Sequence, residues 1–266
     1  MKALEAIGGG VIRQLAYVGG LTIQFWSGLV ASRRALPLVG KRGRWRSALR
    51  QMVAIGVEAL PMIGIVSACV GFIVAIQVAA ELQRFGALPL VVNIVAIGFT
   101  RELGPLVTAI VVSGRSGSAI SAEIGTMVVA NEIDALRTMA IDPIEFVLAP
   151  KYIAAMIAVP CLTVMSNVFG ILAGAVFMRL SADMSFSIYL KSVAEAILLR
   201  DVLLGLLKSC VFAAIVVHVG CLEGFKVRGG PESVGRSTTS AVVKSTFLVI
   251  LADLFLTAVI YLVEAM

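Results

Sequence analysis

Residues 100–143 read TRELGPLVTAIVVSGRSGSAISAEIGTMVVANEIDALRTMAIDP, and this stretch decides the fold. It opens with Arg101 and Glu102 inside a long apolar run. Ionisable side chains at membrane depth are costly, so they mark a functional site by default. Small residues then recur at helical intervals, and a short acidic segment follows. This order predicts a membrane helix with a polar interior and a tightly packed end. A soluble element that could bind a partner outside the membrane would follow it.

The composition is that of a polytopic membrane protein. The 266 residues are 59% hydrophobic and 14% charged, whereas soluble domains average about 25% charged residues. The net charge is +6, and basic residues concentrate in one segment, at Arg33, Arg34, Lys41, Arg42, Arg44, Arg46 and Arg50. A basic cluster beside an apolar segment is typical of a cytoplasmic anchor on anionic lipid. Stacking aromatics are absent there apart from Trp45, so we expect no nucleic-acid partner.

Several segments reach the length of about 20 apolar residues that a membrane span requires. They are residues 52–80, 89–113, 152–178, 201–222 and 243–263. Residues 14–32 predict a helix lying in the membrane interface, with a sixth span as the alternative. The predicted fold is therefore all-α and integral to the membrane, with five transmembrane helices plus an N-terminal interfacial helix.

The Lys/Arg bias of the loops predicts the orientation. If residues 33–50 lie inside the cell, then 114–151 and 223–242 lie inside as well, and these loops carry more basic residues than the outer segments. The N-terminus is then cytoplasmic and the C-terminus lies outside. Residues 183–199 predict a short amphipathic helix on the outer side.

Arg101 and Glu102 each need a separate partner, because neighbouring helical residues do not face each other. Lys208 and Asp253 lie at comparable depth in the fourth and fifth predicted spans. Two interpretations stay open. The charges form a structural network between helices, or they form a polar spot at a substrate path or gate.

The small residues form two rows at four-residue spacing, Gly114, Ser118 and Ala122, and Gly117, Ser121 and Gly125. Small residues at this spacing let helix backbones approach closely within a membrane. The pattern predicts helix packing rather than catalysis.

An acidic segment follows the small residues, with carboxylates at Glu123, Glu132, Asp134, Asp142 and Glu145. Helical spacing predicts that Ile133, Leu136 and Ala140 share one face and that Pro143 stops the helix. The segment is either an ordinary solvated loop helix or a docking helix for a soluble partner.

Catalytic signatures are missing from the sequence. It contains no phosphate-binding loop, no nucleophile–base arrangement and no metal-ligand spacing. The single histidine, His218, and the four cysteines lie in apolar segments, where helix packing is the expected role. We therefore expect no enzyme activity, no metal and no cofactor in this chain.

Three motifs resemble the signature of the MlaE (YrbE-type) permeases: RELGP at 101–105, SGRSGSAISAEIGTM at 113–127 and NEIDALRTMAIDP at 131–143. KSCVFA at 208–213 and the stretch 235–258 agree with that family. The resemblance covers residues 45–263. It implies two parts, an N-terminal interfacial helix with a basic cytoplasmic segment over 1–44 and a permease domain over 45–266.

MlaE permeases are the membrane subunits of bacterial ABC-type lipid transporters associated with MCE proteins. The resemblance implies a homodimer in the bacterial inner membrane that moves phospholipid or a related lipid. It also implies a cytoplasmic ABC ATPase dimer that binds ATP and Mg, a periplasmic MCE-domain hexamer and, in some systems, a STAS-domain protein.

The family resemblance assigns roles to residues of this sequence. The implied lipid pocket or gate comprises Arg101, Glu102, Val74, Val78, Leu82, Phe85, Asp253 and Lys208. The implied ATPase-coupling helix holds Glu132, Ile133, Asp134, Leu136 and Arg137, and the spacing assigns helix packing to Gly114, Gly117, Ser118, Ser121 and Gly125.

Two other classes compete with an ABC permease. A stand-alone ion-coupled secondary transporter would use Glu102, Asp253 and His218 for its cycle. A membrane scaffold without transport would use the charges only to hold helices together.

Overall fold

The computed structural model describes residues 42–265, which are helical with short connections and contain no strand in that range. Five helices are long and apolar enough to cross a membrane: Arg46–Arg84, Leu90–Val129, Phe146–Ala182, Leu199–Phe225 and Pro231–Glu264. The predicted all-α fold with five transmembrane helices is confirmed. The expected interfacial helix over 14–32 lies outside the described residues, and the division at residue 44 stays a prediction.

The first span consists of α2 (Arg42–Ile55), a short 3-10 turn (Val57–Ala59) and α3 (Leu60–Arg84). The break between α2 and α3 lies at Gly56. Arg115 lies across this break, because its guanidinium donates to the carbonyl oxygen of Ala54 at 2.7 Å and to Glu58 at 2.6 Å. Arg115 of the second span therefore stabilises the bend in the first span.

The second span is longer than the sequence predicted. It runs from Leu90 to Val129 as α4 (Leu90–Gly98), α5 (Gly104–Val112) and α6 (Ser118–Val129), joined by π-helical segments at Phe99–Leu103 and Ser113–Gly117. Residues 114–129 thus belong to a helix rather than to an inner loop. Arg101, Glu102 and Gly117 fall in the π-helical turns, where the extra residue re-aims the side chains.

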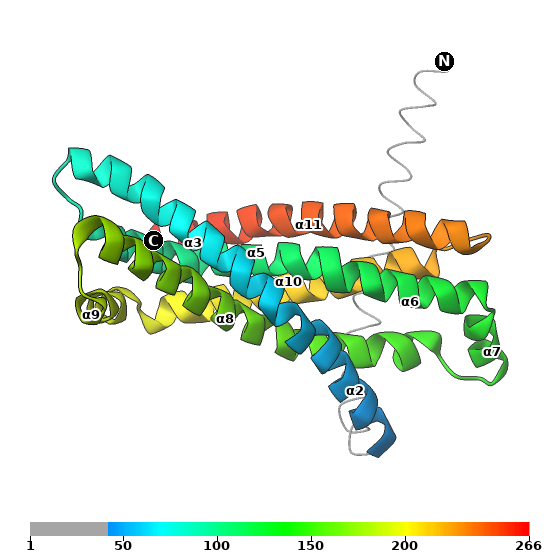
Figure 1. Cartoon of the computed structure of the whole chain (residues 1–266). Helices are drawn as coiled ribbons and strands as arrows, with labels where there is room; N and C mark the ends of the chain where they lie inside the picture. The colour runs from blue at the N-terminus through cyan, green and yellow to red at the C-terminus, as the bar shows by residue number, and fades with distance from the viewer. Residues whose placement is uncertain (1–41, 266) are drawn as a thin grey trace.

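The remaining helices complete a long bundle (Figure 1). They are α7 (Glu132–Thr138), a π-helical turn (Ile144–Leu148), α8 (Ala149–Ala182), α9 (Phe186–Ala196), α10 (Leu199–Phe225) and α11 (Pro231–Ala265). The inner loop predicted at 223–242 is much shorter, because α11 begins at Pro231. At one end α7 connects α6 to α8, and at the other end α9 connects α8 to α10 near the end of α11 (Figure 1). The amphipathic helix predicted within 183–199 is α9.

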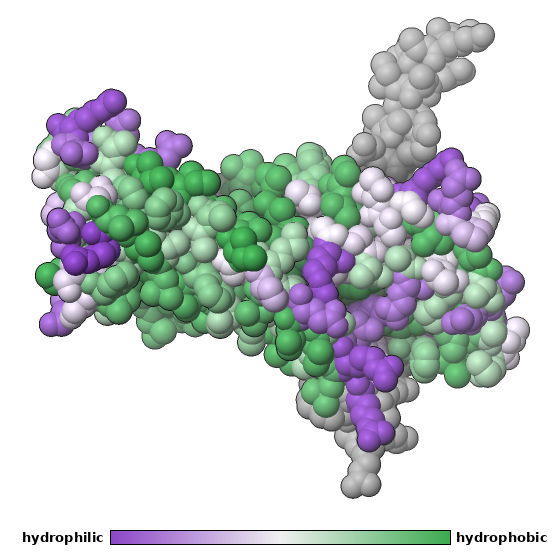
Figure 2. All heavy atoms as spheres, in the orientation of Figure 1, coloured by the Kyte–Doolittle hydropathy of each residue, from purple (hydrophilic) through white to green (hydrophobic). Residues whose placement is uncertain are grey.

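Close backbone approach holds α3 against α8. A methyl group placed on Gly71 would lie 2.1 Å from the carbonyl oxygen of Gly170, so neither helix tolerates a side chain there. Phe99 of the second span packs on Gly170 of α8. Apolar side chains cover the middle of the bundle, and polar ones gather at its two ends (Figure 2).

Candidate functional site

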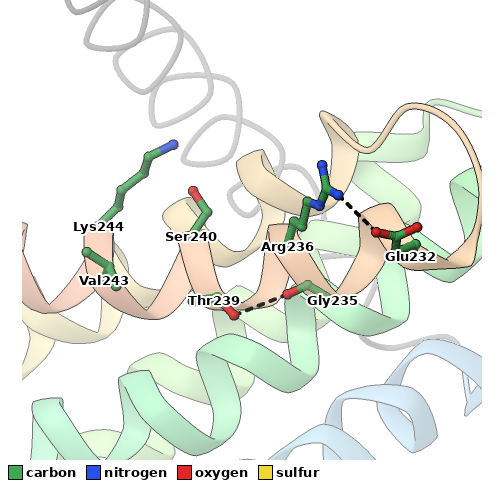
Figure 3. A pocket seen from close by; sticks show the side chains of 7 residues that line it. All are labelled: Glu232, Gly235, Arg236, Thr239, Ser240, Val243 and Lys244. Carbon is green, nitrogen blue, oxygen red and sulfur yellow. Dashed lines mark hydrogen bonds and ion pairs between the residues drawn. The ribbon is translucent and has the colours of Figure 1, made fainter.

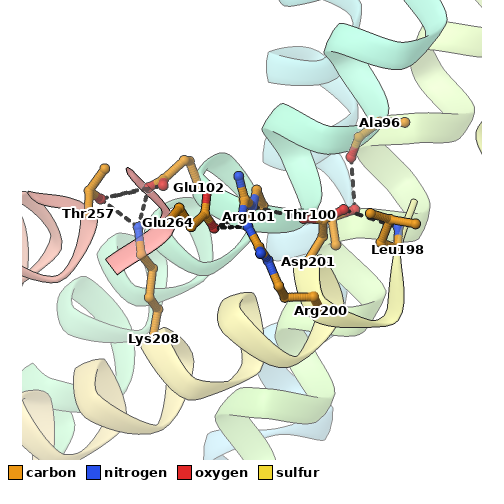
Figure 4. A network of polar contacts seen from close by, with 10 residues as sticks. All are labelled: Ala96, Thr100, Arg101, Glu102, Leu198, Arg200, Asp201, Lys208, Thr257 and Glu264. Carbon is orange, nitrogen blue, oxygen red and sulfur yellow. Dashed lines mark hydrogen bonds and ion pairs between the residues drawn. The ribbon is translucent and has the colours of Figure 1, made fainter. Parts of the chain in front are cut away.

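A buried lysine forms the centre of the charged network. Lys208 lies in α10 and is 1% exposed. Its ammonium donates to Glu102, to Asp253 Oδ1 at 2.9 Å and to Thr257 Oγ1 at 2.7 Å. Three hydrogen bonds use all three donors of an ammonium group. The Thr257 hydroxyl in turn donates to Glu102 Oε2 at 3.3 Å (Figure 4).

Three spans supply this Lys208 network. Glu102 comes from the π-helical turn of the second span, Lys208 from α10, and Asp253 with Thr257 from neighbouring turns of α11. The structure thus brings together Glu102, Lys208 and Asp253, which the sequence placed at comparable depth. One cation faces two carboxylates, so the network carries one net negative charge.

Arg101 points to different partners. Its Nε lies 2.8 Å from Asp201 Oδ1, and its Nη2 binds Glu264, which also binds Arg200 (Figure 4). The sequence reasoning missed both partners of Arg101, and it missed Arg200, the second partner of Glu264. Asp201 could have been found, because it occupies the first turn of a predicted span, where a carboxylate caps the helix. Its Oδ2 accepts the backbone N–H of Leu198 at 3.0 Å.

The two parts of the site lie at different depths. Asp201 and Arg200 lie in the first turn of α10, and Glu264 lies in the last turn of α11. Arg101 is therefore level with the ends of two helices. Lys208 lies about 14 Å of helix beyond the start of α10, at about 1.5 Å per residue. Charged side chains thus occur both at the end of the bundle and farther inside its apolar part.

The predicted pocket residues of the first span lie along one face of α3. Val74, Val78 and Leu82 are half-buried and pack on the cluster that contains Val91 and Phe99. Phe85 follows α3 in the turn and is 79% exposed. Within the single chain Val74, Val78 and Leu82 pack on residues of α4 and α8. The role of all four residues toward lipid stays a prediction.

Two hollows occur on other faces. An apolar groove of about 590 Å³ runs between α3 and α8, lined by Ala68, Cys69, Phe72, Ile73, Phe169, Leu172, Ala173 and Val176. A hollow of about 630 Å³ lies along the start of α11 (Figure 3), lined by Glu232, Gly235, Arg236, Thr239, Ser240, Val243 and Lys244. Neither hollow contains a residue that the sequence assigned to the lipid pocket.

The part of the acidic segment that contains Glu132 and Asp134 forms α7, which buries its apolar face against the rest of the chain. Ile133 and Leu136 belong to the main apolar cluster, whereas Glu132, Asp134 and Arg137 are exposed. The exposed charges are the part of α7 that a partner could touch.

Two details of the predicted docking helix are wrong. Ala140 is exposed with φ of 57°, so it follows the helix in a left-handed conformation and does not share the buried face. Pro143 does not stop α7, which already ends at Thr138. It instead precedes the next helical turn, where its fixed φ suits a helix start.

The two rows of small residues behave differently. Gly117, Ser121 and Gly125 are buried, and the Ser121 hydroxyl lies 3.0 Å from that of Ser237 in α11. A methyl group on Gly117 would lie 3.1 Å from Val216 of α10. Gly114 faces open space, and the Ser118 hydroxyl bonds to the carbonyl oxygen of Gly114 at 2.6 Å. The row of Gly117, Ser121 and Gly125 therefore packs against α10 and α11, whereas Gly114 of the other row meets no neighbouring helix.

His218 stands apart from the charged network. It is buried in α10, its Nδ1 lies 2.6 Å from the carbonyl oxygen of Ala214, and its ring meets the edge of Tyr152 at 5.2 Å. About 15 Å of helix separates it from Lys208. Across the described part of the chain, no cluster of His, Cys, Asp or Glu is arranged to hold a metal ion.

Comparison with known proteins decides the family. The family model "Permease MlaE" matches residues 48–259. The chain belongs to the MlaE permease family. A probable ABC transporter permease of Rickettsia typhi is 35% identical over 213 residues, which is 80% of this chain and 82% of that protein. A probable ABC transporter permease of Synechocystis is 38% identical over 211 residues, 79% of this chain and 80% of that protein.

A relative also occurs in a plant. Protein TRIGALACTOSYLDIACYLGLYCEROL 1, chloroplastic, of Arabidopsis thaliana is 35% identical over 237 residues, which is 88% of this chain and 68% of that protein. This MlaE permease is therefore a multi-pass ABC transporter permease, and such a permease implies a separate ATPase partner.

Proposed function

We propose that this MlaE permease moves phospholipid or a related lipid between the bacterial inner membrane and a periplasmic MCE-protein assembly. The observation that carries the proposal is the Lys208 network. It places Glu102, Lys208 and Asp253 inside the membrane-spanning helices of a chain from this family.

Charge and exposure support a role for this network in transport. Charges inside a span are costly and are kept mainly where they meet a substrate or a water-filled path. Lys208 is buried, but the Glu102 side chain is 38% exposed, so one carboxylate of the network remains accessible. A lipid headgroup could meet this carboxylate while the surrounding apolar helices bury acyl chains. The name of the Arabidopsis relative refers to a galactolipid, which fits a lipid substrate.

The proposed partners follow from the two ends of the bundle. At the α7 end, Glu132, Asp134 and Arg137 present an exposed charged face to a cytoplasmic ABC ATPase dimer, which would bind ATP and Mg. At the α9 end, a periplasmic MCE-domain hexamer would receive the lipid. The permease would act as a homodimer, and a STAS-domain protein would join the ATPase in some systems.

The proposed location is the bacterial inner membrane, with the N-terminus cytoplasmic and the C-terminus periplasmic. The α7 end carries more basic side chains than the α9 end, including Arg137, Lys151, Arg228 and Arg236. Basic residues favour the cytoplasmic side. Transport between the two membranes would then serve the lipid asymmetry of the outer membrane.

The stand-alone ion-coupled transporter has less support. Glu102 and Asp253 do meet at Lys208, but His218 lies about 15 Å of helix away from Lys208 along α10. Membership in an ABC permease family favours an ATP-driven cycle over an ion-driven one.

Lipid transfer in proteoliposomes tests the proposal. The permease would be reconstituted with its ATPase, and ATP-driven movement of a fluorescent phospholipid would be measured for the wild type and for Glu102→Gln. We expect transfer by the wild type and a loss of transfer in the variant, with assembly unchanged. Glu195→Gln, an exposed carboxylate on α9, is the matched control. No ATP-dependent transfer by the wild type would contradict the proposal.

Photocrosslinking locates the path. Probes at Val78 and Leu82 should capture phospholipid in an ATP-dependent manner. A probe at Ile157, which is exposed on the outside of α8, should capture lipid independently of ATP. Identical ATP-independent capture at all three positions would exclude a lipid path along α3.

A further inference from the structure

Glu264 holds two arginines from different helices. Its Oε1 binds Nη2 of Arg101 from the second span and Nη2 of Arg200 from α10 (Figure 4). Guanidinium groups are the side chains that proteins favour for binding carboxylate and phosphate, and two of them meet at this one oxygen. The two groups therefore form an anion site, and Glu264 of the same chain occupies it.

The charges of the site match a monoanion. Asp201 is fixed by its bond from the Leu198 N–H, and it binds the Nε of Arg101 at 2.8 Å. This leaves the outer nitrogens of Arg101 and Arg200 for a second anion. Arg101, Arg200 and Asp201 carry one net positive charge, which Glu264 neutralises. A phosphodiester carries the same single negative charge as that carboxylate.

Glu264 is held by its charge more than by packing. It is 26% exposed, and Arg200 is 59% exposed, so the site is open to a ligand at the end of the bundle. The residues that precede Glu264 in the last turn of α11 are exposed: Tyr261, Leu262 and Val263. Because this turn has few buried apolar contacts, it can move away at low cost.

We propose that Glu264 is an internal substitute for a lipid phosphate, which displaces it from the Arg101–Arg200 site. The proposal rests on the proposed function for the identity of the lipid. The inference adds a binding site for the lipid phosphate. It also adds a competing carboxylate, Glu264, which occupies the site again once the lipid has left. The site lies next to the Lys208 network, because Arg101 and Glu102 are neighbours in the second span.

Binding of soluble lipid probes tests the competition. Dihexanoyl-phosphatidylglycerol, neutral dihexanoylglycerol and inorganic phosphate would be titrated into the purified, ATPase-bound permease. Glu264→Gln keeps the shape and removes the competing charge. We expect it to bind dihexanoyl-phosphatidylglycerol about fivefold more tightly than the wild type, as befits a partly exposed ion pair. Binding of dihexanoylglycerol should not change.

Arg200→Gln is the complementary variant and should weaken binding of the phosphatidyl probe. Glu195→Gln on α9 is the matched control and should bind like the wild type. Equal affinities of Glu264→Gln and the wild type would overturn the proposal. A gain for inorganic phosphate without a gain for the phosphatidyl probe would also overturn it, because the site would then take free phosphate.

The outcomes separate this inference from the proposed function. If the wild type transfers phospholipid but Glu264→Gln binds the probe no better, the inference fails and the function stands. If Glu264→Gln binds the probe more tightly but no phospholipid is transferred, the anion site is real and the proposed function fails.

Discussion

Two regions of the contact between the second span and α10 differ, because charged side chains take part in only one of them. Toward the α9 end, Lys208 gathers Glu102 and Asp253 from two other spans. Toward the α7 end, Gly117 and Gly220 let the second span and α10 approach so closely that a methyl group on Gly220 would lie 3.0 Å from the Gly117 carbonyl oxygen. Close packing stabilises helices in lipid, whereas buried ion pairs can often be replaced by apolar groups without loss. The charges are therefore the part whose retention points to function.

Removing the central cation should have the largest effect. Lys208→Met leaves the carboxylates of Glu102 and Asp253 without their cation, and removing one member of a buried ion pair costs about 3–5 kcal/mol. We expect a lowered unfolding temperature and a poor yield of folded protein in detergent. The matched change on the same helix is Leu207→Met, an exposed position that should leave stability unchanged. An unfolding temperature for Lys208→Met equal to that of the wild type would show that Glu102 and Asp253 do not depend on Lys208 for their stability.

Adding a bulky side chain where the second span packs on α10 should have the next largest effect on stability. Gly117→Leu drives a side chain against Val216, and overpacking typically costs about 1–3 kcal/mol. Gly114→Leu is the matched control, because Gly114 lies in the same helix and faces open space. Thermal unfolding of the isolated protomer should be lowered by the first change only. Equal losses from both changes would mean that the two rows of small residues pack alike.

The sequence predicted the architecture because its signals are local. Apolar length predicted five spans, and small residues at four-residue spacing predicted a packed row. The same spacing could not distinguish Gly117, which packs on α10, from Gly114, which faces open space. The choice depends on the π-helical turn at Ser113–Gly117, which rotates the helix and which residue types alone do not reveal.

The sequence found half of the charged site. Lys208 and Asp253 were identifiable because a charged residue within an apolar span is recognisable whichever face of the helix it occupies. Arg200, Asp201 and Glu264 were missed because they lie at span ends, where charges are ordinary. Asp201 and Glu264 meet Arg101, and Arg200 meets Glu264, because of how α10 and α11 end in space.

Reversing the charge on the exposed face of α7 should have a smaller effect, which concerns binding of the ATPase. Glu132→Lys with Asp134→Lys should weaken the ATPase complex about tenfold, or about 1.4 kcal/mol, because the charge of the docking face is reversed. The permease should stay folded, since both side chains are exposed. Glu232→Lys, an exposed carboxylate at the start of α11, is the control. Unchanged co-purification of the ATPase and unchanged ATP turnover would remove α7 as its docking element.

The Tyr189 hydroxyl bonds α9 to α8, and its removal should have the smallest effect on stability. Its hydroxyl donates to the carbonyl oxygen of Ile171 at 3.2 Å, and burial raises the pKa of Tyr189 to about 12. Tyr189→Phe should cost about 1 kcal/mol, the usual worth of one hydrogen bond. The raised pKa means that this contribution is present below pH 10 and is lost as the pH rises from about 10 toward 12. Chemical denaturation across this range should show the alkaline loss in the wild type only, and the same loss in Tyr189→Phe would assign it to another group.

The role of the buried charges is tested most directly by neutralising all of them together. The triple variant Glu102→Gln, Lys208→Met, Asp253→Asn leaves no unpaired charge, so its unfolding temperature should return close to that of the wild type. Its ATP-driven phospholipid transfer in proteoliposomes should nevertheless be lost, because the charges that meet the lipid are gone. A stable triple variant that transfers phospholipid at the wild-type rate would show that the Lys208 network only holds the helices together.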